Sequence, residues 1–310
     1  MNRGATTQRN PGPGWGYGFL TWAEHWWPRW IFRPAFMAGT WIGLACMPLQ
    51  RAHSRDYLRL VLGRPARLID VWRHFFAFAE SLMFRLRVAR TGRIRSRLSP
   101  KHAAELERLL ESGEPALFGT FHFGSSDLLG YMLGDRIHHV SVIRLNVGNS
   151  DDTRRLGERF GGRVSFLWIN ERADHLFELK LALESGESLA MKCDRVEFTG
   201  KVETFSYLGV PRRFPVPIYH LAILTGRPVV FCIGLPRDSD DEIEVTSSAV
   251  FRADPAAGRA ANLEAARIHF RSVLDRLETL NRKFPFQWFN FMPMNPESSR
   301  RGKTETEGDL

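Results

Sequence analysis

Two side chains in the stretch "GTFHFGSSDLLG", residues 119–130, have the types needed for proton transfer. His122 ends an apolar run that is typical of a strand, and Asp127 follows five positions later. In one regular helix these side chains would point about 140° apart, so they can meet only if a turn separates a strand from a helix. Gly124 permits that turn, and Ser125 or Ser126 can cap the helix. A carboxylate bonded to one imidazole nitrogen leaves the other nitrogen as a base.

Three interpretations of this pair stay open from the residues alone. The pair can activate Ser125 or Ser126, as in a serine hydrolase, although no G-x-S-x-G turn is present. It can instead activate a hydroxyl that belongs to a substrate. In the third interpretation, His122 lies on the surface and Asp127 only caps a helix.

The composition favours an acidic partner. The chain has 310 residues, 44% of them hydrophobic, and a formal net charge of +9; only six of its 43 basic residues are lysines. Arginine suits phosphate and carboxylate groups, although a general richness in arginine is the alternative. No nucleic-acid recognition motif accompanies the charge, so we predict no nucleic-acid partner. The spacing of Cys46, Cys193 and Cys232 predicts neither a metal site nor a disulfide, and we expect no cofactor.

The N-terminal region predicts contact with a membrane. Residues 1–18 read as a flexible N-terminus, and six of the nine tryptophans lie within the first 41 residues. The uncharged run at 34–50 is slightly shorter than the roughly 20 residues that span a bilayer, so an interfacial or half-inserted helix is favoured over a buried hairpin. Twelve arginines follow between residues 51 and 98, and we interpret 19–98 as a helical, basic, membrane-associating segment. A solvated loop is the simpler interpretation of the arginines at its end.

The remaining chain predicts an α/β core over residues 99–295. Strand-like runs such as "ALFGTF", "HHVSVIRL", "RVSFLWI", "SLAMKCD", "PVVFCIGL" and "IEVTSSAV" alternate with helix-like runs such as "DDTRRLGERFGG" and "ADHLFELKLALESG". This alternation predicts a single α/β sheet flanked by helices. The tail, residues 296–310, is predicted to be disordered.

Five short blocks, in this order, resemble the late lipid A (lauroyl and myristoyl) acyltransferases of the lysophospholipid acyltransferase superfamily. "HFGSSD" resembles the family's H-x-x-x-x-[DE] box, and "VIRLN" resembles the segment with a substrate-contacting arginine, here Arg144. "SGESLAMKCDR" resembles a strand that ends in an Asp-Gln pair, here Asp194 and Arg195. "FSYLGVPRRFPVPIYHLAILTGRPVVF" resembles an aromatic-rich loop before a helix and a strand, and "FPFQWFNF" resembles the Pro-x-Gln-x-x-Trp segment.

The resemblance implies an acyltransferase-like fold and a reaction. His122 would be the general base, oriented by Asp127, and would deprotonate a hydroxyl of a lipid or glycolipid acceptor. The donor would be an acyl-carrier protein or acyl-CoA thioester, and no metal or cofactor would take part. The resemblance and the local arginines give the expected substrate-binding residues Arg144, Arg172, Asp194 and Arg195.

The family also implies a place of action and leaves the acceptor open. We expect the protein at the cytoplasmic face of the bacterial inner membrane, on an anionic surface, peripheral or with a single N-terminal anchor. Asp127 stands where the lipid A branch commonly has Glu, and Arg195 where it has Gln. The acceptor is therefore lipid A or another membrane-associated hydroxyl or amine compound. A lipid or thioester hydrolase that uses the same pair, and a non-catalytic protein that binds anionic membranes, are the alternatives.

Overall fold

Apolar β-strands form the centre of the chain. The computed structural model describes residues 14–129, 139–144, 164–168, 175–196, 199–235 and 242–294. Seven described strands make one sheet in the order β1-β9-β8-β2-β5-β3-β4. Their bounds are β1 Arg95–Leu98, β2 Leu117–Thr120, β3 Val140–Arg144, β4 Val164–Trp168, β5 Ser188–Lys192, β8 Val229–Gly234 and β9 Glu242–Ser247. Strands β8 and β9 run antiparallel and the other neighbouring pairs run parallel, which confirms the predicted α/β class.

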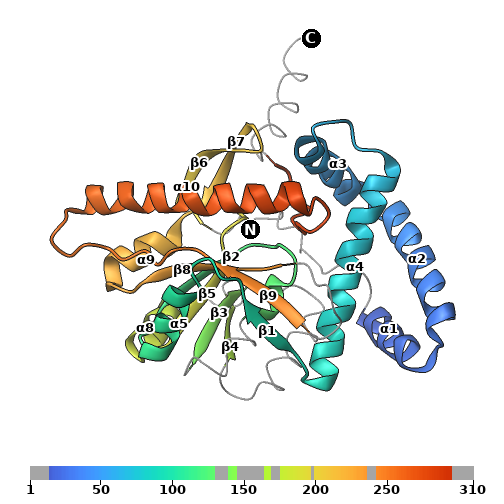
Figure 1. Cartoon of the computed structure of the whole chain (residues 1–310), viewed down its shortest axis with the longest axis horizontal. Coiled ribbons are helices and arrows are strands. Elements are labelled where there is room, and N and C mark those ends of the chain that lie inside the picture. The colour runs from blue at the N-terminus through green and yellow to red at the C-terminus, as the bar shows by residue number, and fades with distance from the viewer. Residues whose placement is uncertain are drawn as a thin grey trace, which may run out of the picture.

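Helices cover both faces of this sheet (Figure 1). Alternate side chains of a strand point to opposite faces, so Leu117 of β2 joins one apolar core and Phe118 joins the other. Phe270 of α10 belongs to the first core, and Leu106 of α5 belongs to the second. The helices that flank the sheet are α5 Ala103–Ser112, α8 His175–Glu184, α9 Pro217–Thr225 and α10 Arg259–Lys283.

The register between β2 and β5 brings two chain segments together at one edge of the sheet. Thr120 lies opposite Lys192 in this parallel pair. Continuing the same register by two residues places His122 opposite Asp194. Both residues therefore leave the sheet at the carboxyl ends of adjacent strands, where ligand sites of α/β proteins are commonly built.

The N-terminal part of the chain forms a group of helices beside the sheet (Figure 1). Their bounds are α1 Gly14–Trp26, α2 Arg29–Cys46, α3 Pro48–Leu62 and α4 Leu68–Thr91. Asp70 lies in the first turn of α4, accepts a hydrogen bond from the Arg67 backbone N–H and pairs with Arg64. Within the described residues, no helix combines the length and the apolar character that a membrane crossing requires.

Two features differ from the elements that the sequence predicts, and a third is not tested. The arginine-rich run after α4 contains β1, which pairs with β9 as the outer strand of the described sheet. Arg97 also pairs with Glu242 and Glu244 across these two strands. The segment predicted as an aromatic-rich loop is a hairpin of β6 Val202–Tyr207 and β7 Val210–Pro215, so a two-stranded sheet accompanies the main one. The helix predicted in "DDTRRLGERFGG" lies outside the described residues.

A buried aromatic cluster joins the N-terminal helices to the α/β core. Its centre is Trp288, whose ring lies 5.1 Å from that of Tyr57 and 5.5 Å from that of Tyr207. The hydroxyl of Tyr57 donates to Asn281 Oδ1 at 2.7 Å, and Asn281 Nδ2 donates to the Tyr207 hydroxyl at 2.5 Å. Both tyrosines thus satisfy their polar ends inside the protein.

His74 of α4 makes a second polar connection in this cluster. Its Nε2 lies 2.9 Å from the Trp288 carbonyl oxygen, and its Nδ1 lies 2.8 Å from the Ser54 hydroxyl. Because a carbonyl can only accept, Nε2 carries the proton and Nδ1 accepts from Ser54. Burial lowers the pKa of His74 to about 4, against the opposing effect of the Trp288 carbonyl.

We predict that acid weakens the fold through His74. Between pH 6.5 and pH 4 the unfolded chain binds a proton that folded His74 excludes, so the free energy of unfolding falls as the pH is lowered. The contribution of this side chain is about 3 kcal/mol, from the shift of its pKa. Urea unfolding between pH 7 and pH 4 should give a shallower dependence for His74→Gln, which cannot titrate, than for the wild type. The exposed His25→Gln is the matched control, and equal slopes in His74→Gln and wild type would contradict the prediction.

Candidate functional site

His122 lies just beyond the end of β2, in a segment that the C-terminal part of the chain holds in place. Its carbonyl oxygen accepts from the Phe289 backbone N–H at 2.6 Å. The N–H of Gly124 donates to the Gln287 carbonyl oxygen at 2.8 Å. These bonds make the chain after His122 a short strand-like neighbour of residues 287–289, and so they fix the position of the imidazole.

The turn after His122 requires glycine on both sides of a close contact. Gly124 has a φ of +52°, and a Cβ atom there would lie 2.3 Å from the Gly234 carbonyl oxygen. The Ser126 hydroxyl accepts from the Gly234 backbone N–H at 3.1 Å, which ties the turn to the end of β8. A 3-10 turn, Ser126–Leu128, follows, as the expected strand-turn-helix arrangement requires. Ser125, at the N-cap position, makes no side-chain capping bond.

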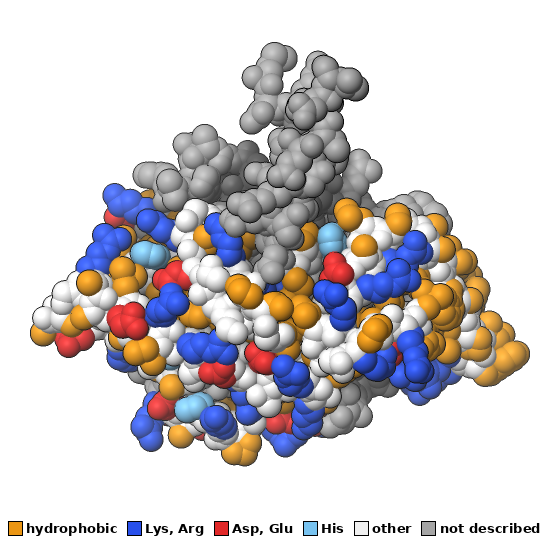
Figure 2. All heavy atoms as spheres, turned by 90° about the horizontal axis from the view of Figure 1, so that it is seen from above, with side chains coloured by type: hydrophobic (Ala, Val, Ile, Leu, Met, Phe, Trp, Pro, Cys, Tyr) orange, Lys and Arg blue, Asp and Glu red, His pale blue; other side chains and the backbone are white. Residues whose placement is uncertain are grey.

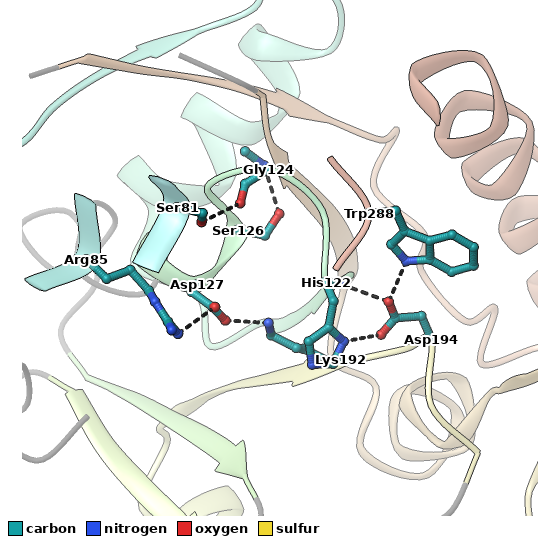
Figure 3. Close-up of polar contacts among 10 residues, drawn as sticks. Ser81, Arg85, His122, Gly124, Ser126, Asp127, Lys192, Asp194 and Trp288 are labelled. Atoms are coloured by element: carbon teal, nitrogen blue, oxygen red, sulfur yellow. Dashed lines mark hydrogen bonds and ion pairs between the residues drawn. The ribbon is translucent and has the colours of Figure 1, made fainter. Parts of the chain in front are cut away.

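The buried carboxylate that contacts the His122 ring belongs to Asp194 (Figure 3). Its Oδ1 lies 2.7 Å from His122 Nδ1, and its Oδ2 accepts from the His122 backbone N–H at 2.9 Å. The Asp194 side chain has no exposed surface, whereas 18% of the His122 side chain is exposed. Two further donors, Arg212 Nη2 and Asn290 Nδ2, bond to the Asp194 carbonyl oxygen at 3.2 and 3.1 Å.

The charge state of this pair follows from its surroundings. Burial opposes ionisation of Asp194, but its contacts with His122 and the charge of Arg195 outweigh burial and keep the pKa of Asp194 well below its usual range. An ionised carboxylate can only accept, so His122 Nδ1 carries the proton. Burial and then the charge of Arg195 lower the pKa of His122 to about 4, against the pull of Asp194. At neutral pH the imidazole is therefore uncharged, and Nε2 carries its lone pair.

Asp127 does not contact the His122 ring, so the prediction that it orients the imidazole is wrong. Its carboxylate pairs with Arg85 Nη1 of α4 at 2.8 Å and with Lys192 Nζ of β5 (Figure 3). Burial opposes ionisation of Asp127, but Lys192 and Arg85 outweigh it and hold the pKa of Asp127 well below its usual range. The correction has a simple cause: the β2–β5 register places Asp194, and not Asp127, beside the ring nitrogen.

The four expected substrate-binding residues have different surroundings. Arg144, at the end of β3, is part of the positive surroundings of Asp127 and lies 5.8 Å over the Phe166 ring. Arg195 is near enough to His122 and Asp194 to shift both pKa values, and its Nε is buried without a hydrogen-bond partner in the described part of the chain. Asp194 differs from the expectation, because its carboxylate is fully buried and bonded to His122. Arg172 lies outside the described residues.

The serines beside His122 are buried. Ser125 is 7% exposed and Ser126 is 4% exposed. The Ser126 hydroxyl is engaged with the N–H of Gly234, so its packing favours a structural role over a nucleophilic one.

Four residues that bear on the site were not predicted: Lys192, Arg85, Arg212 and Trp288. Lys192 is the last residue of β5 and lies two positions before Asp194, and this alternate spacing could have indicated a shared side of the chain. Trp288 lies in the block "FPFQWFNF", which gave no contact for it, and its indole Nε1 donates to Asp194 Oδ2 at 2.8 Å. Arg85 and Arg212 are far from the site in sequence, and no local pattern marks either of them.

Comparisons with known proteins give similarity of structure but not of sequence. No protein-family model matches the chain, and no curated protein sequence matches it. The fold is similar to that in the crystal structure of the 1-acyl-sn-glycerophosphate (LPA) acyltransferase PlsC from Thermotoga maritima. That similarity has 12% sequence identity, covers 81% of this chain and 99% of that chain, and has a TM-score of 0.36.

We predict that Asp194→Asn reverses the tautomer of His122. The amide has one oxygen, and two donors, the His122 backbone N–H and the Trp288 indole N–H, converge on the Oδ2 position. The amide NH₂ group then faces Nδ1, which must become an acceptor, so the ring proton moves to Nε2. Nitrogen-15 NMR of labelled histidine at pH 7 should detect this exchange in Asp194→Asn. Asp127→Asn is the matched control and should keep the proton on Nδ1; an Nδ1–H tautomer in Asp194→Asn would contradict the prediction.

Proposed function

We propose that this protein is an acyltransferase in which His122 is the general base and Asp194 orients it. The observation that carries the proposal is the buried Asp194 carboxylate on His122 Nδ1, which leaves Nε2 with a lone pair at neutral pH. The ordered resemblance of five sequence blocks to late lipid A acyltransferases supports the reaction class. The fold is consistent with it, because the pair lies at the carboxyl edge of a mainly parallel sheet.

The reaction proceeds in two proton transfers. His122 Nε2 removes the proton of an acceptor hydroxyl while the oxygen attacks the carbonyl carbon of an acyl thioester. The new C–O bond forms, the C–S bond breaks, and the leaving thiolate takes the proton from the imidazolium. The negative charge of Asp194 stabilises the imidazolium between these steps.

The acceptor and donor belong to the same proposal. The acceptor is a lipid or glycolipid hydroxyl, of lipid A or a related membrane compound, and the donor is an acyl-carrier-protein or acyl-CoA thioester. Positive charge surrounds both the His122–Asp194 pair and the Asp127 carboxylate, and it comes from Arg144, Lys192 and Arg195. Such charge suits phosphate-bearing substrates. We assign the reaction to the cytoplasmic face of the bacterial inner membrane.

Acyl transfer should depend on His122. Loss of the general base in His122→Ala should lower the rate of transfer from palmitoyl-CoA or palmitoyl-acyl-carrier protein to a bacterial lipid extract by about 10²–10⁴-fold. Because the pKa of His122 is about 4, kcat/KM of the wild type should be level near pH 7 and fall only as the pH approaches 4. Mass spectrometry of the extract identifies the acylated product, and thiol release without an acceptor measures hydrolysis.

The control for this experiment is Ser125→Ala. It should retain transfer, because no covalent acyl-enzyme is required. Full activity in His122→Ala would contradict the assignment. Trapping of an acyl group on Ser125 or Ser126 would instead establish a hydrolase-type mechanism.

We further propose that α1 and α2 bind the membrane surface. Hydrophobic side chains gather with basic ones at the end of the molecule where Figure 1 places α2 (Figure 2). Trp26 is 68% exposed and Trp30 is 76% exposed, and Arg29 and Arg33 are exposed beside them. Tryptophan and arginine at one helical surface suit the boundary between headgroups and acyl chains.

Vesicle binding tests this surface. Each large apolar side chain that enters the bilayer contributes about 1.5–3 kcal/mol, so Trp26→Ser with Trp30→Ser should weaken binding to phosphatidylglycerol vesicles by about tenfold or more. Replacing Arg29 and Arg33 with Gln should remove the salt-sensitive part of the binding. Leu224→Ser on α9 is the matched control, since this leucine is 80% exposed on the α/β core. Unchanged binding of the double tryptophan variant in flotation would refute the assignment.

A further inference from the structure

The Asp194 carboxylate receives a third donor from a segment remote from both β2 and β5. Trp288 Nε1 donates to Oδ2 at 2.8 Å, and Oδ2 also accepts from the His122 backbone N–H at 2.9 Å (Figure 3). The remaining oxygen, Oδ1, faces His122 Nδ1 at 2.7 Å. The two donors on Oδ2 therefore determine the orientation of the carboxylate plane, and in this orientation Oδ1 faces the imidazole.

The Trp288 ring is buried and packed against aromatic and charged side chains. Only 1% of the residue is exposed, and its ring makes edge contacts with Tyr57 and Tyr207. The Arg212 guanidinium lies 4.4 Å over the ring, and the Trp288 carbonyl accepts from His74 Nε2. A ring packed this tightly has no alternative orientation, so its N–H is aimed at Asp194 before any substrate arrives.

We propose that Trp288 is a positioning residue for the His122–Asp194 pair, because its indole N–H fixes the orientation of the carboxylate that holds the imidazole. The role in catalysis rests on the proposed function, in which His122 is the base. The hydrogen bond has a second consequence. A carboxylate that already accepts from the indole has less electron density to offer His122, so the bond limits how strongly Asp194 attracts a proton to the ring.

The sharpest test removes the N–H and keeps the ring. Site-specific replacement of Trp288 by 3-benzothienylalanine puts sulfur in place of the indole N–H in a ring of nearly the same shape. Asp194 then loses one donor and becomes a stronger acceptor, so the pKa of His122 should rise from about 4 by about one unit. Histidine NMR in the full-length protein without substrate measures this pKa, and the acid limb of kcat/KM should move upward with it.

Trp72 provides the matched control. It is also a buried tryptophan, and its Nε1 has no hydrogen-bond partner among the described residues. The same replacement at Trp72 removes an N–H and no bond, so it should leave the His122 pKa unchanged. Trp288→Phe and Trp72→Phe repeat the comparison with natural residues, and circular dichroism verifies that each variant is folded.

The outcomes separate the two proposals. A higher His122 pKa in the Trp288 replacement, with no shift in the Trp72 replacement, supports the positioning role even if no acyl transfer is detected. An unshifted pKa and an unshifted acid limb in folded Trp288 variants would overturn it, because a tryptophan that only fills the core alters stability alone. Acyl transfer that depends on His122 would in that case leave the proposed function intact.

Discussion

The buried negative charge of Asp194 is the constraint on which the site depends. An isolated carboxylate inside a protein is strongly unfavourable, and it persists only where hydrogen-bond donors and positive charge compensate for lost hydration. Here the donors come from residues 122 and 288, far apart in sequence, and bond to the carboxylate oxygens, while Arg212 and Asn290 bond to the backbone carbonyl of the same residue. Satisfying this carboxylate therefore requires the end of β2, the end of β5 and the segment after α10 to meet, and the bond from Arg212 to the Asp194 carbonyl adds β7 to the same junction.

Asp127 balances the positive charges of Lys192 and Arg85. Lys192 is near enough to His122 to affect its pKa, and both Lys192 and Arg85 are largely withdrawn from water. The Asp127 carboxylate neutralises part of their charge and joins α4 to β5 beside the turn that carries His122. The two carboxylates thus have different roles. Asp194 determines the tautomer of the imidazole, and Asp127 holds Lys192 and Arg85 in place. The carboxylate five residues after His122 thus has a structural role in which it does not contact Nδ1.

The N-terminal helices contribute to the site as well as to the surface that we assign to the membrane. Tyr57 of α3 and His74 of α4 contact Trp288, and Trp288 contacts Asp194. A chain of packed and hydrogen-bonded side chains therefore connects the helical segment with the imidazole. The same helical segment has exposed tryptophans on α1 and α2, and a buried tyrosine and a buried histidine on α3 and α4. Its outer face is the surface that we propose for lipid, and its inner face packs on the core.

The sequence by itself determined the α/β class, the strands on either side of the site and the turn at Gly124, because these depend on local periodicity and on one backbone conformation. It also marked Asp194 through the order of its blocks, but not as the partner of His122. Only the tertiary structure decided that partner, because the choice follows from the register of β2 against β5, a contact between residues 72 positions apart. Strand β1 and the roles of Arg85, Arg212 and Trp288 were likewise decided by long-range contacts, which the spacing of residues along the chain does not encode.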